Sequence, residues 1–256
     1  MARRFLIRGM LCGIAAGLLV FILAKLFGEP NVDGAIGFEE QLAHLAGTAH
    51  EHEDDIVSRD LQSTWGLFVG VMVYATALGG LFSLLYAHAW GRMGKLGARA
   101  SAALLAGAAF VAIYVVPFAK YPANPPSVGN PDTIGSRTGL YFGMLVISIV
   151  AMTAAVNLGR ALVRRWGNWN AAIAGGLAFL ILVGIAYALM PTVNEVPDGF
   201  PAALLWQFRT VTFALQLTLW TSLGLLFGWL TERSLSARAN WAAGGPLPFT
   251  GKGDRR

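Results

Sequence analysis

Long apolar runs recur along this chain with only short polar segments between them, and they restrict the fold more than any other feature. Six runs have the length of about 20 residues that a helix needs to cross a bilayer, at residues 5–27, 65–90, 100–118, 138–162, 171–190 and 203–230. Charged residues make up only 13% of the chain, about half the share in a soluble domain. A transmembrane β-barrel would show short alternating segments instead. We therefore predict an all-α integral membrane protein with six transmembrane helices.

The first run has two interpretations. A basic start followed by an apolar core is typical of a signal peptide. Here the apolar run extends to Phe27, which is longer than the usual core, and no clear small-x-small cleavage site precedes Glu29. We therefore favour a first span that is retained in the mature protein.

Basic residues are concentrated in alternate polar segments. The N-terminus, the 91–99 and 160–165 turns and the tail after residue 231 hold 14 of the 19 Lys and Arg residues but only two of the 14 Asp and Glu residues. Short cytoplasmic loops are rich in Lys and Arg, so we predict that both termini face the cytoplasm. The location that we predict is the bacterial cytoplasmic (inner) membrane. The net charge of +5 follows from this topology, and no nucleic-acid partner is expected.

The domain plan follows from this orientation. Residues 1–231 form the predicted six-span domain and residues 232–256 a flexible cytoplasmic tail. The outer loops are residues 28–64, 119–137 and 191–203.

Arginines near the starts of the even spans indicate an internal repeat. Arg59, Arg137 and Arg209 each lie near such a start, and each odd span leads to a loop with proline and an acid. Three helical hairpins with one plan would explain the pattern, because transporters often contain repeats. The alternative is that arginine is simply common at membrane interfaces.

The loop at the middle of the chain is interrupted by prolines. Proline removes a backbone donor and fixes φ, so we expect no helix to cross residues 116–137. Unpaired backbone groups are too costly to face lipid, which places this segment in water or between helices at one membrane face. The residues expected to shape the outer loops are Lys120, Tyr121, Pro122, Asn124, Pro125, Pro126, Arg137 and Arg209.

Histidines and carboxylates alternate in the first outer loop. Three of the four histidines of the chain fall within nine residues there, and imidazole with carboxylate is a ligand set suited to Co²⁺, Ni²⁺ or Zn²⁺. The candidate metal ligands are His44, His50, His52, Glu51, Glu53 and Asp54. The alternative is a solvated acidic loop with incidental histidines.

Further acids lie near the outer ends of the predicted spans, where carboxylates raise the local concentration of cations. They are Glu29, Glu39, Glu40, Asp132, Glu195 and Asp198. The alternative is that acids merely accumulate outside. Arg137 and Arg209 each begin a span, where a cation meets the unfavourable end of the helix dipole. We therefore expect these arginines to form ion pairs with Glu29, Asp132, Glu195 or Asp198 and to fix the loops.

Enzyme motifs are absent from the sequence, which has no HExxH, Walker loop, GxSxG or redox CxxC pattern. We therefore predict no enzymatic activity. No carboxylate lies clearly at the centre of a span, and a site there would have little to neutralise a divalent ion.

A different class of function is a non-transporting subunit that scaffolds a larger membrane complex. Such a subunit needs no metal at His50 and His52.

Several segments resemble the CbtA family, the probable cobalt transporter subunits. The resemblance extends from Arg8-Gly-Met to Leu226-Phe-Gly, and its most specific parts are Phe27-Gly-Glu-Pro, Val116-Pro-Phe-Ala-Lys-Tyr-Pro-Ala-Asn-Pro-Pro, Asn130-Pro-Asp-Thr-Ile and Glu195-Val-Pro-Asp-Gly-Phe-Pro.

This resemblance implies a membrane subunit for cobalt uptake and cobalamin supply. It also implies a small single-span partner with a His-rich end. No stably bound cofactor is expected, since Co²⁺ would be the transported ion. Many members have a denser His run in the first outer loop and are sometimes predicted to have five spans, whereas we predict six spans here.

Overall fold

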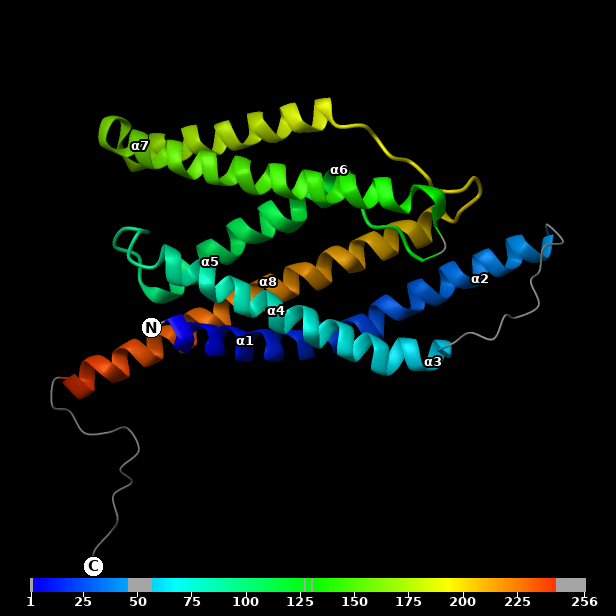
Figure 1. Ribbon diagram of the computed structural model, residues 1–256, viewed down its shortest axis with the longest axis horizontal. Coiled ribbons are helices and arrows are strands. Elements are labelled where there is room, and N and C mark those ends of the chain that lie inside the picture. Colours follow the sequence, from blue (N-terminus) through cyan, green and yellow to red (C-terminus); the bar gives the residue numbers. More distant parts are fainter. Residues whose placement is uncertain (1, 46–56, 127, 130, 243–256) are drawn as a thin grey trace, which may run out of the picture. The chain divides into compact units, whose positions relative to one another are not determined.

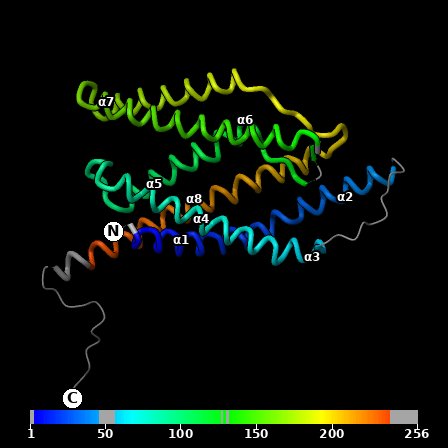
Figure 2. Tube along the Cα trace, in the orientation of Figure 1, coloured from blue at the N-terminus to red at the C-terminus, as the bar shows by residue number. Residues whose placement is uncertain are grey.

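The computed structural model describes residues 2–45, 57–126, 128–129 and 131–242 (Figure 1). All regular structure in these residues is helical, and Figure 2 traces the same path. The α-helices are α1 (Ala2–Leu23), α2 (Glu29–Leu45), α3 (Arg59–Leu61), α4 (Leu67–Ala89), α5 (Ala98–Ala109), α6 (Val116–Lys120), α7 (Ile134–Leu189) and α8 (Ala202–Ala242). Three π-helical segments, η1 (Ala24–Gly28), η2 (Gln62–Gly66) and η3 (Phe110–Val115), join them, and a 3₁₀ turn, η4 (Pro131–Thr133), precedes α7.

Within the described residues, five continuous helices are long and apolar enough to cross a membrane: Arg3–Leu45, Arg59–Ala89, Ala98–Lys120, Ile134–Leu189 and Ala202–Ala237. The prediction of an all-α chain with several membrane-spanning helices is confirmed at this level. The number of predicted runs and the number of continuous helices differ because the fourth and fifth runs both lie in α7.

The α7 helix doubles back on itself at Gly167. This residue has φ 74° and ψ 170° inside an element of 56 residues, and only glycine adopts such a backbone conformation at little cost. The two arms then pack together (Figure 1), with Met144, Ala151 and Ala155 of the first arm in one buried cluster with Phe179 and Val183 of the second. Sequence spacing alone placed a turn in this region because Arg164 and Arg165 interrupt the apolar pattern.

Two expectations about the loops were wrong. Residues 28–64 are not one open loop, because the helix that begins as α1 continues through η1 to the end of α2 at Leu45. The midpoint segment is also shorter than predicted, since the third helix reaches Lys120 across Pro117 and α7 begins at Ile134.

The π-helical segments explain how prolines enter these helices. A proline inside an α-helix loses one hydrogen bond and clashes with the carbonyl four residues earlier. For Pro30 that carbonyl belongs to Leu26 in η1, and for Pro117 it belongs to Ile113 in η3. Local widening to a π-turn accommodates such a residue in a membrane helix. The helices therefore continue past both prolines, and the expectation that no helix enters residues 116–137 was wrong at Pro117.

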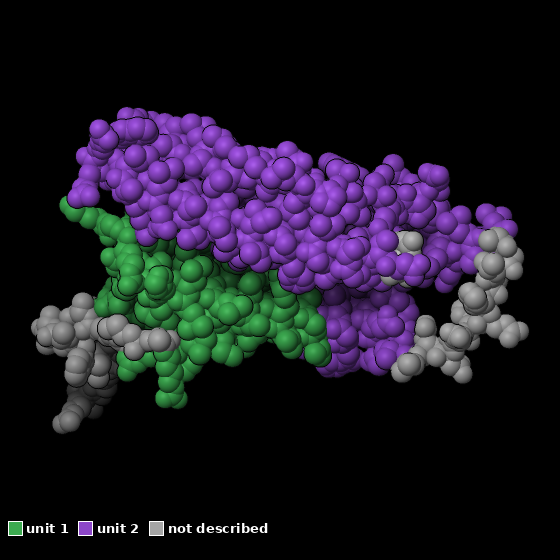
Figure 3. Space-filling view, turned by 45° about the horizontal axis from the view of Figure 1, so that its top comes forward, with its two compact units in different colours: residues 1–19, 69–107, 218–256 green, residues 20–68, 108–217 purple. Residues whose placement is uncertain are grey.

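The chain divides into two compact units, coloured in Figure 3. Unit 1 contains residues 1–19, 69–107 and 218–256, and unit 2 contains residues 20–68 and 108–217.

In unit 1, α1 and α4 approach so closely that their backbones touch. A methyl group built on Gly9 would overlap the carbonyl oxygen of Gly79, and one built on Gly13 would overlap that of Ala75. Gly9, Gly13 and Gly17 recur every fourth residue and therefore lie along one helical face. Small residues at this spacing permit close packing of membrane helices. The sequence analysis did not use this pattern.

Aromatic rings and one arginine complete the core of unit 1. The Tyr86 ring lies 5.6 Å from the Phe5 ring and 4.9 Å from the Phe227 ring. Arg8 donates hydrogen bonds to Oγ1 of Thr231 at 3.0 Å and to Oγ of Ser234 at 2.8 Å. The N-terminal part of α1 is thereby joined to the C-terminal part of α8.

Candidate functional site

The three segments predicted as outer loops meet at one end of unit 2, which we call the loop end. It comprises α2, α3, the described residues of 121–133, and residues 190–209; in Figure 1 these lie toward the right of unit 2. Ala35 of α2, Val128 of the midpoint segment and Phe200 of the third segment form one buried apolar cluster. The Phe38 ring packs edge-on against the Phe200 ring, with 5.1 Å between centroids. Burial of these side chains holds the segments together.

Arg59 joins α3 to α2 at the loop end. Ser58 caps this short helix by accepting a hydrogen bond from the backbone N–H of Leu61. The Arg59 guanidinium donates to Oδ1 of Asp33 at 2.9 Å and to the Glu29 carboxylate, whose side chain is only 11% exposed. Glu29 and Asp33 are four residues apart on one helix face, so a single arginine reaches both.

Arg137, in the first turn of α7, forms an ion pair with Glu195 at 3.1 Å between Nε and Oε2. This is one of the ion pairs that the sequence predicted. Gly129, with φ 125°, lies directly against the same guanidinium, where a methyl group would overlap Nη1. The glycine therefore allows the midpoint segment to cover Arg137, and the ion pair joins α7 to the third segment.

Arg209 behaves differently from the prediction. Its Nε donates to the carbonyl oxygen of Ala123 at 3.1 Å and its Nη2 to Oδ1 of Asn124 at 2.8 Å. Within the described part of the chain it has no ion pair with a carboxylate. The predicted acidic partner was wrong because Arg209 lies two turns into α8, beneath the midpoint segment, whose nearest acceptors there are neutral.

The three arginine contacts follow a common plan. Each arginine lies within the first eight residues of a helix and binds a residue one or two positions before a proline. The acceptors are Glu29, which precedes Pro30; Asn124, which precedes Pro125; and Glu195, which lies two residues before Pro197. The contacts of Arg137 and Arg209 join the midpoint region to the third segment and α8, whereas Arg59 joins α3 to α2 within the first segment.

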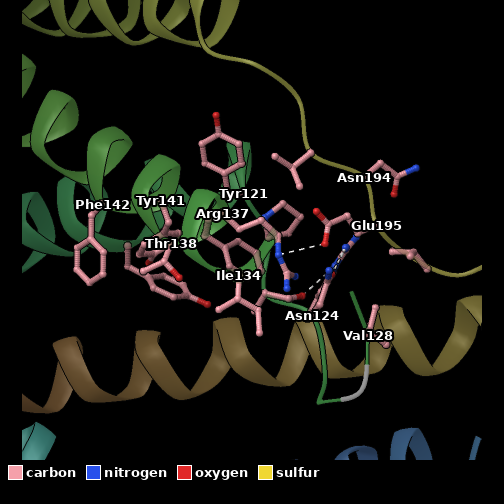
Figure 4. Close-up of a pocket in the computed structure, with 17 residues that line it drawn as sticks. Tyr121, Asn124, Val128, Ile134, Arg137, Thr138, Tyr141, Phe142, Asn194 and Glu195 are labelled. Atoms are coloured by element: carbon pink, nitrogen blue, oxygen red, sulfur yellow. Dashed lines mark hydrogen bonds and ion pairs between the residues drawn. The ribbon is translucent and has the colours of Figure 1, made fainter. Parts of the chain in front are cut away.

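A pocket of about 580 Å³ opens between the midpoint segment, the start of α7, the third segment and α8 (Figure 4). Aromatic side chains of Tyr114, Phe118, Tyr141 and Phe142 form part of its wall. Its charged lining residues are Arg137, Arg209 and Glu195, and its neutral polar ones include Asn124, Thr138 and Asn194. In Figure 4 Arg137 and Glu195 face each other, with Asn124 beside them.

Other predicted loop residues have structural contacts. Lys120 donates to the carbonyl oxygen of Tyr187 at 2.9 Å, and the Tyr121 hydroxyl donates to that of Pro191 at 2.8 Å. Burial raises the pKa of Tyr121 above its ordinary value, so its hydroxyl stays protonated and remains a donor. Pro122 lines the pocket, Pro125 is buried and Pro126 is exposed.

The predicted metal ligands are only partly described. His44 is exposed near the C-terminal end of α2, on the same helix as the exposed Glu39 and Glu40. His50, Glu51, His52, Glu53 and Asp54 lie outside the described residues. Among the residues that are described, no three His, Cys, Asp or Glu side chains come together as a metal-binding group. Asp132 and Asp198 are exposed at separate points of the loop end.

Two functional features escaped the sequence analysis. Asp33 and Arg59 were not among the candidate site residues, although the four-residue spacing of Glu29 and Asp33 would have indicated a shared face had the helix been extended to Leu45. The pocket residues Thr138, Tyr141 and Asn194 were also missed, since no local pattern connects them.

Several long apolar helices with polar segments between them, together with a loop end held by partly buried ion pairs, define a multi-pass α-helical membrane protein. The chain belongs to the CbtA family, described as a probable cobalt transporter subunit, whose family model matches residues 2–232. The term subunit implies that other chains take part in the transport system. No curated protein and no solved structure matches this chain.

Proposed function

We propose that this chain is the membrane subunit of a cobalt uptake system whose outer segments collect the cation. The observation that carries the proposal, together with family membership, is the assembly of α2, the midpoint segment and the third segment into one loop end. Seven of the 12 acids in residues 1–231 lie in these segments, and the other five lie between residues 51 and 60, directly after α2. A negative surface at one membrane face raises the local concentration of a divalent cation.

The proposed collecting site is the end of α2 and the segment that follows it. His44, Glu39 and Glu40 are exposed there, and His50, Glu51, His52, Glu53 and Asp54 follow within ten residues. Imidazole and carboxylate ligands on such a segment bind Co²⁺, and Ni²⁺ or Zn²⁺ as well. A small single-span partner with a His-rich end would receive or supply the ion.

Replacing His44, His50 and His52 together by alanine is expected to lower cobalt accumulation several-fold when external cobalt is limiting, because the imidazole ligands are lost. The measurement is uptake of radioactive cobalt by cells or vesicles with and without the partner. His88, the remaining histidine of the chain, provides the matched control, and His88→Ala should leave uptake unchanged. Equal uptake by the triple variant and the wild type would refute collection by these histidines.

The rival function is a scaffold that does not handle the metal. It is favoured by the fact that Glu29, Asp33 and Glu195 are already bound by arginines in the structure. A scaffold would tolerate the triple histidine substitution, and cobalt uptake by the complex would still be lost when the whole chain is removed. The same uptake experiment therefore separates the two functions.

We also propose six membrane crossings with both termini in the cytoplasm. The support is the reversal of α7 at Gly167, which provides two antiparallel arms, and the meeting of the three outer segments at one end of unit 2. Two arms of α7 bring the chain back to the side from which it started, as the distribution of basic residues requires.

Labelling of single cysteines is expected to show this topology. In a Cys12→Ala background, a membrane-impermeant maleimide should label Asp198→Cys from outside and Trp169→Cys only after permeabilisation. Asp198 and Trp169 are both exposed, and Trp169 lies just after the reversal of α7. Labelling of both positions from the same side of an intact membrane would contradict the proposal that each arm of α7 crosses the membrane.

A further inference from the structure

We propose that the pocket at the loop end binds an anionic group, a carboxylate or a phosphate, through Arg209. Its volume of about 580 Å³ falls in the range of small-molecule sites. This inference does not depend on cobalt collection by the histidines, because none of those residues lines the pocket.

The balance of charge in the pocket is positive. Two arginines and one glutamate line it, and Glu195 is already bound to Arg137 at 3.1 Å. Of the two arginines that line the pocket, Arg209 is therefore the one that forms no ion pair with a carboxylate of the described residues. A partly buried cation without an opposite charge is unfavourable next to an apolar medium, and an anion in the pocket would remove this cost.

The geometry of Arg209 suits an anionic ligand. A guanidinium has five N–H donors in a planar fork, and two of its nitrogens, Nε and Nη2, hold Ala123 and Asn124. These contacts fix the side chain beneath the midpoint segment. Among the described residues no hydrogen bond engages Nη1, so this nitrogen can bind a ligand. Arginine binds carboxylates and phosphates through such remaining donors, with charge-assisted hydrogen bonds.

The pocket does not suit a bare divalent cation. It contains no histidine or cysteine among its lining residues, and its one carboxylate is neutralised by Arg137. Co²⁺ prefers imidazole, thiolate or carboxylate ligands and would meet an excess of positive charge here. The apolar wall formed by Tyr114, Phe118 and Phe142 instead suits the organic part of a molecule that carries the anionic group.

Anion binding is tested on the full-length protein in nanodiscs of phosphatidylcholine, with two probes. Native mass spectrometry counts retained phosphatidylglycerol after this lipid is added to the discs, and thermal unfolding measures stabilisation by inorganic phosphate. The first probe reports a lipid headgroup as the source of the anion, and the second reports a soluble anion.

Whichever of the two probes binds the wild-type protein, phosphatidylglycerol or inorganic phosphate, we expect Arg209→Gln to weaken its binding by about tenfold or more. Loss of hydrogen bonds to a charged group has an effect of this size. Asn194→Asp is a second variant, since Asn194 is exposed on the pocket wall and keeps its size while it adds a negative charge. It should also abolish binding. The control is Arg165→Gln, which removes an exposed arginine outside this pocket and should have no effect.

Binding of either probe that is sensitive to Arg209 and Asn194 but not to Arg165 supports the proposal. Wild-type protein that binds neither probe overturns it. Equal binding by wild type and Asn194→Asp also overturns it, even if Arg209→Gln fails to fold. Cobalt uptake is not measured here, so failure of the anion site and failure of the proposed metal collection are distinguishable.

Discussion

Replacing Gly13 by leucine is expected to destabilise the protein more than any other single change considered for unit 1. A side chain at this position would overlap the carbonyl oxygen of Ala75 and press on the Cα of Thr76. These atoms belong to the backbone of α4 and cannot rotate away, so the two helices must separate. Overpacking of this kind costs up to about 3 kcal/mol, and more where the backbone cannot move.

The expected result is a lower unfolding temperature in detergent and a loss of the monodisperse peak in size-exclusion chromatography. Gly70→Leu is the matched control, because Gly70 lies in α4 as well but has no atom within 4 Å of an added Cβ. If both variants unfolded at the same temperature, the close approach of α1 and α4 would not be a determinant of stability.

Replacing Arg59 by methionine is expected to have the second-largest effect. The substitution removes the cation that holds both Glu29 and Asp33, and the Glu29 carboxylate is left largely buried without its partner. Loss of one member of a buried ion pair costs about 3–5 kcal/mol. Because the Arg59 side chain is 33% exposed, solvent screening reduces the expected loss to about 2 kcal/mol.

The charge origin of this loss is testable by compensation. In the Arg59→Met background, Glu29→Gln with Asp33→Asn should restore much of the unfolding temperature, because no uncompensated carboxylate then remains. Arg92→Met, at an exposed turn between α4 and α5, serves as the control and should be neutral. Failure of the two amides to restore stability would show that Arg59 acts through packing of its side chain rather than through charge.

Local sequence patterns predicted the helices well where the apolar period was long. The runs at 65–90 and 100–118 correspond to Arg59–Ala89 and Ala98–Lys120. Patterns failed where tertiary packing overrides local preference. The first run was predicted to end at Phe27, but the helix continues through η1 and Pro30 to Leu45. No helix was expected within residues 116–137, but α6 contains the buried Pro117 and extends to Lys120.

The candidate site was predictable in part. An ion pair for Arg137 was predicted because a cation is unfavourable at the positive end of a helix dipole. The structure shows Glu195 as its partner. The same argument failed for Arg209, because the partner of a side chain depends on which segment covers it. The midpoint segment presents Ala123 and Asn124 at that position.

By itself, the sequence determined that this is an α-helical membrane protein, because apolar length and the placement of charge are properties of single segments. Its resemblance to the CbtA family rested on short motifs such as residues 116–126, and the family model confirms it. Only the tertiary structure decided that α1 and α4 meet through glycines, that Arg59 binds two carboxylates, and that three distant segments enclose a positively charged pocket. Each of these features depends on contacts between residues far apart in the chain, and such contacts leave no periodic trace in a linear sequence.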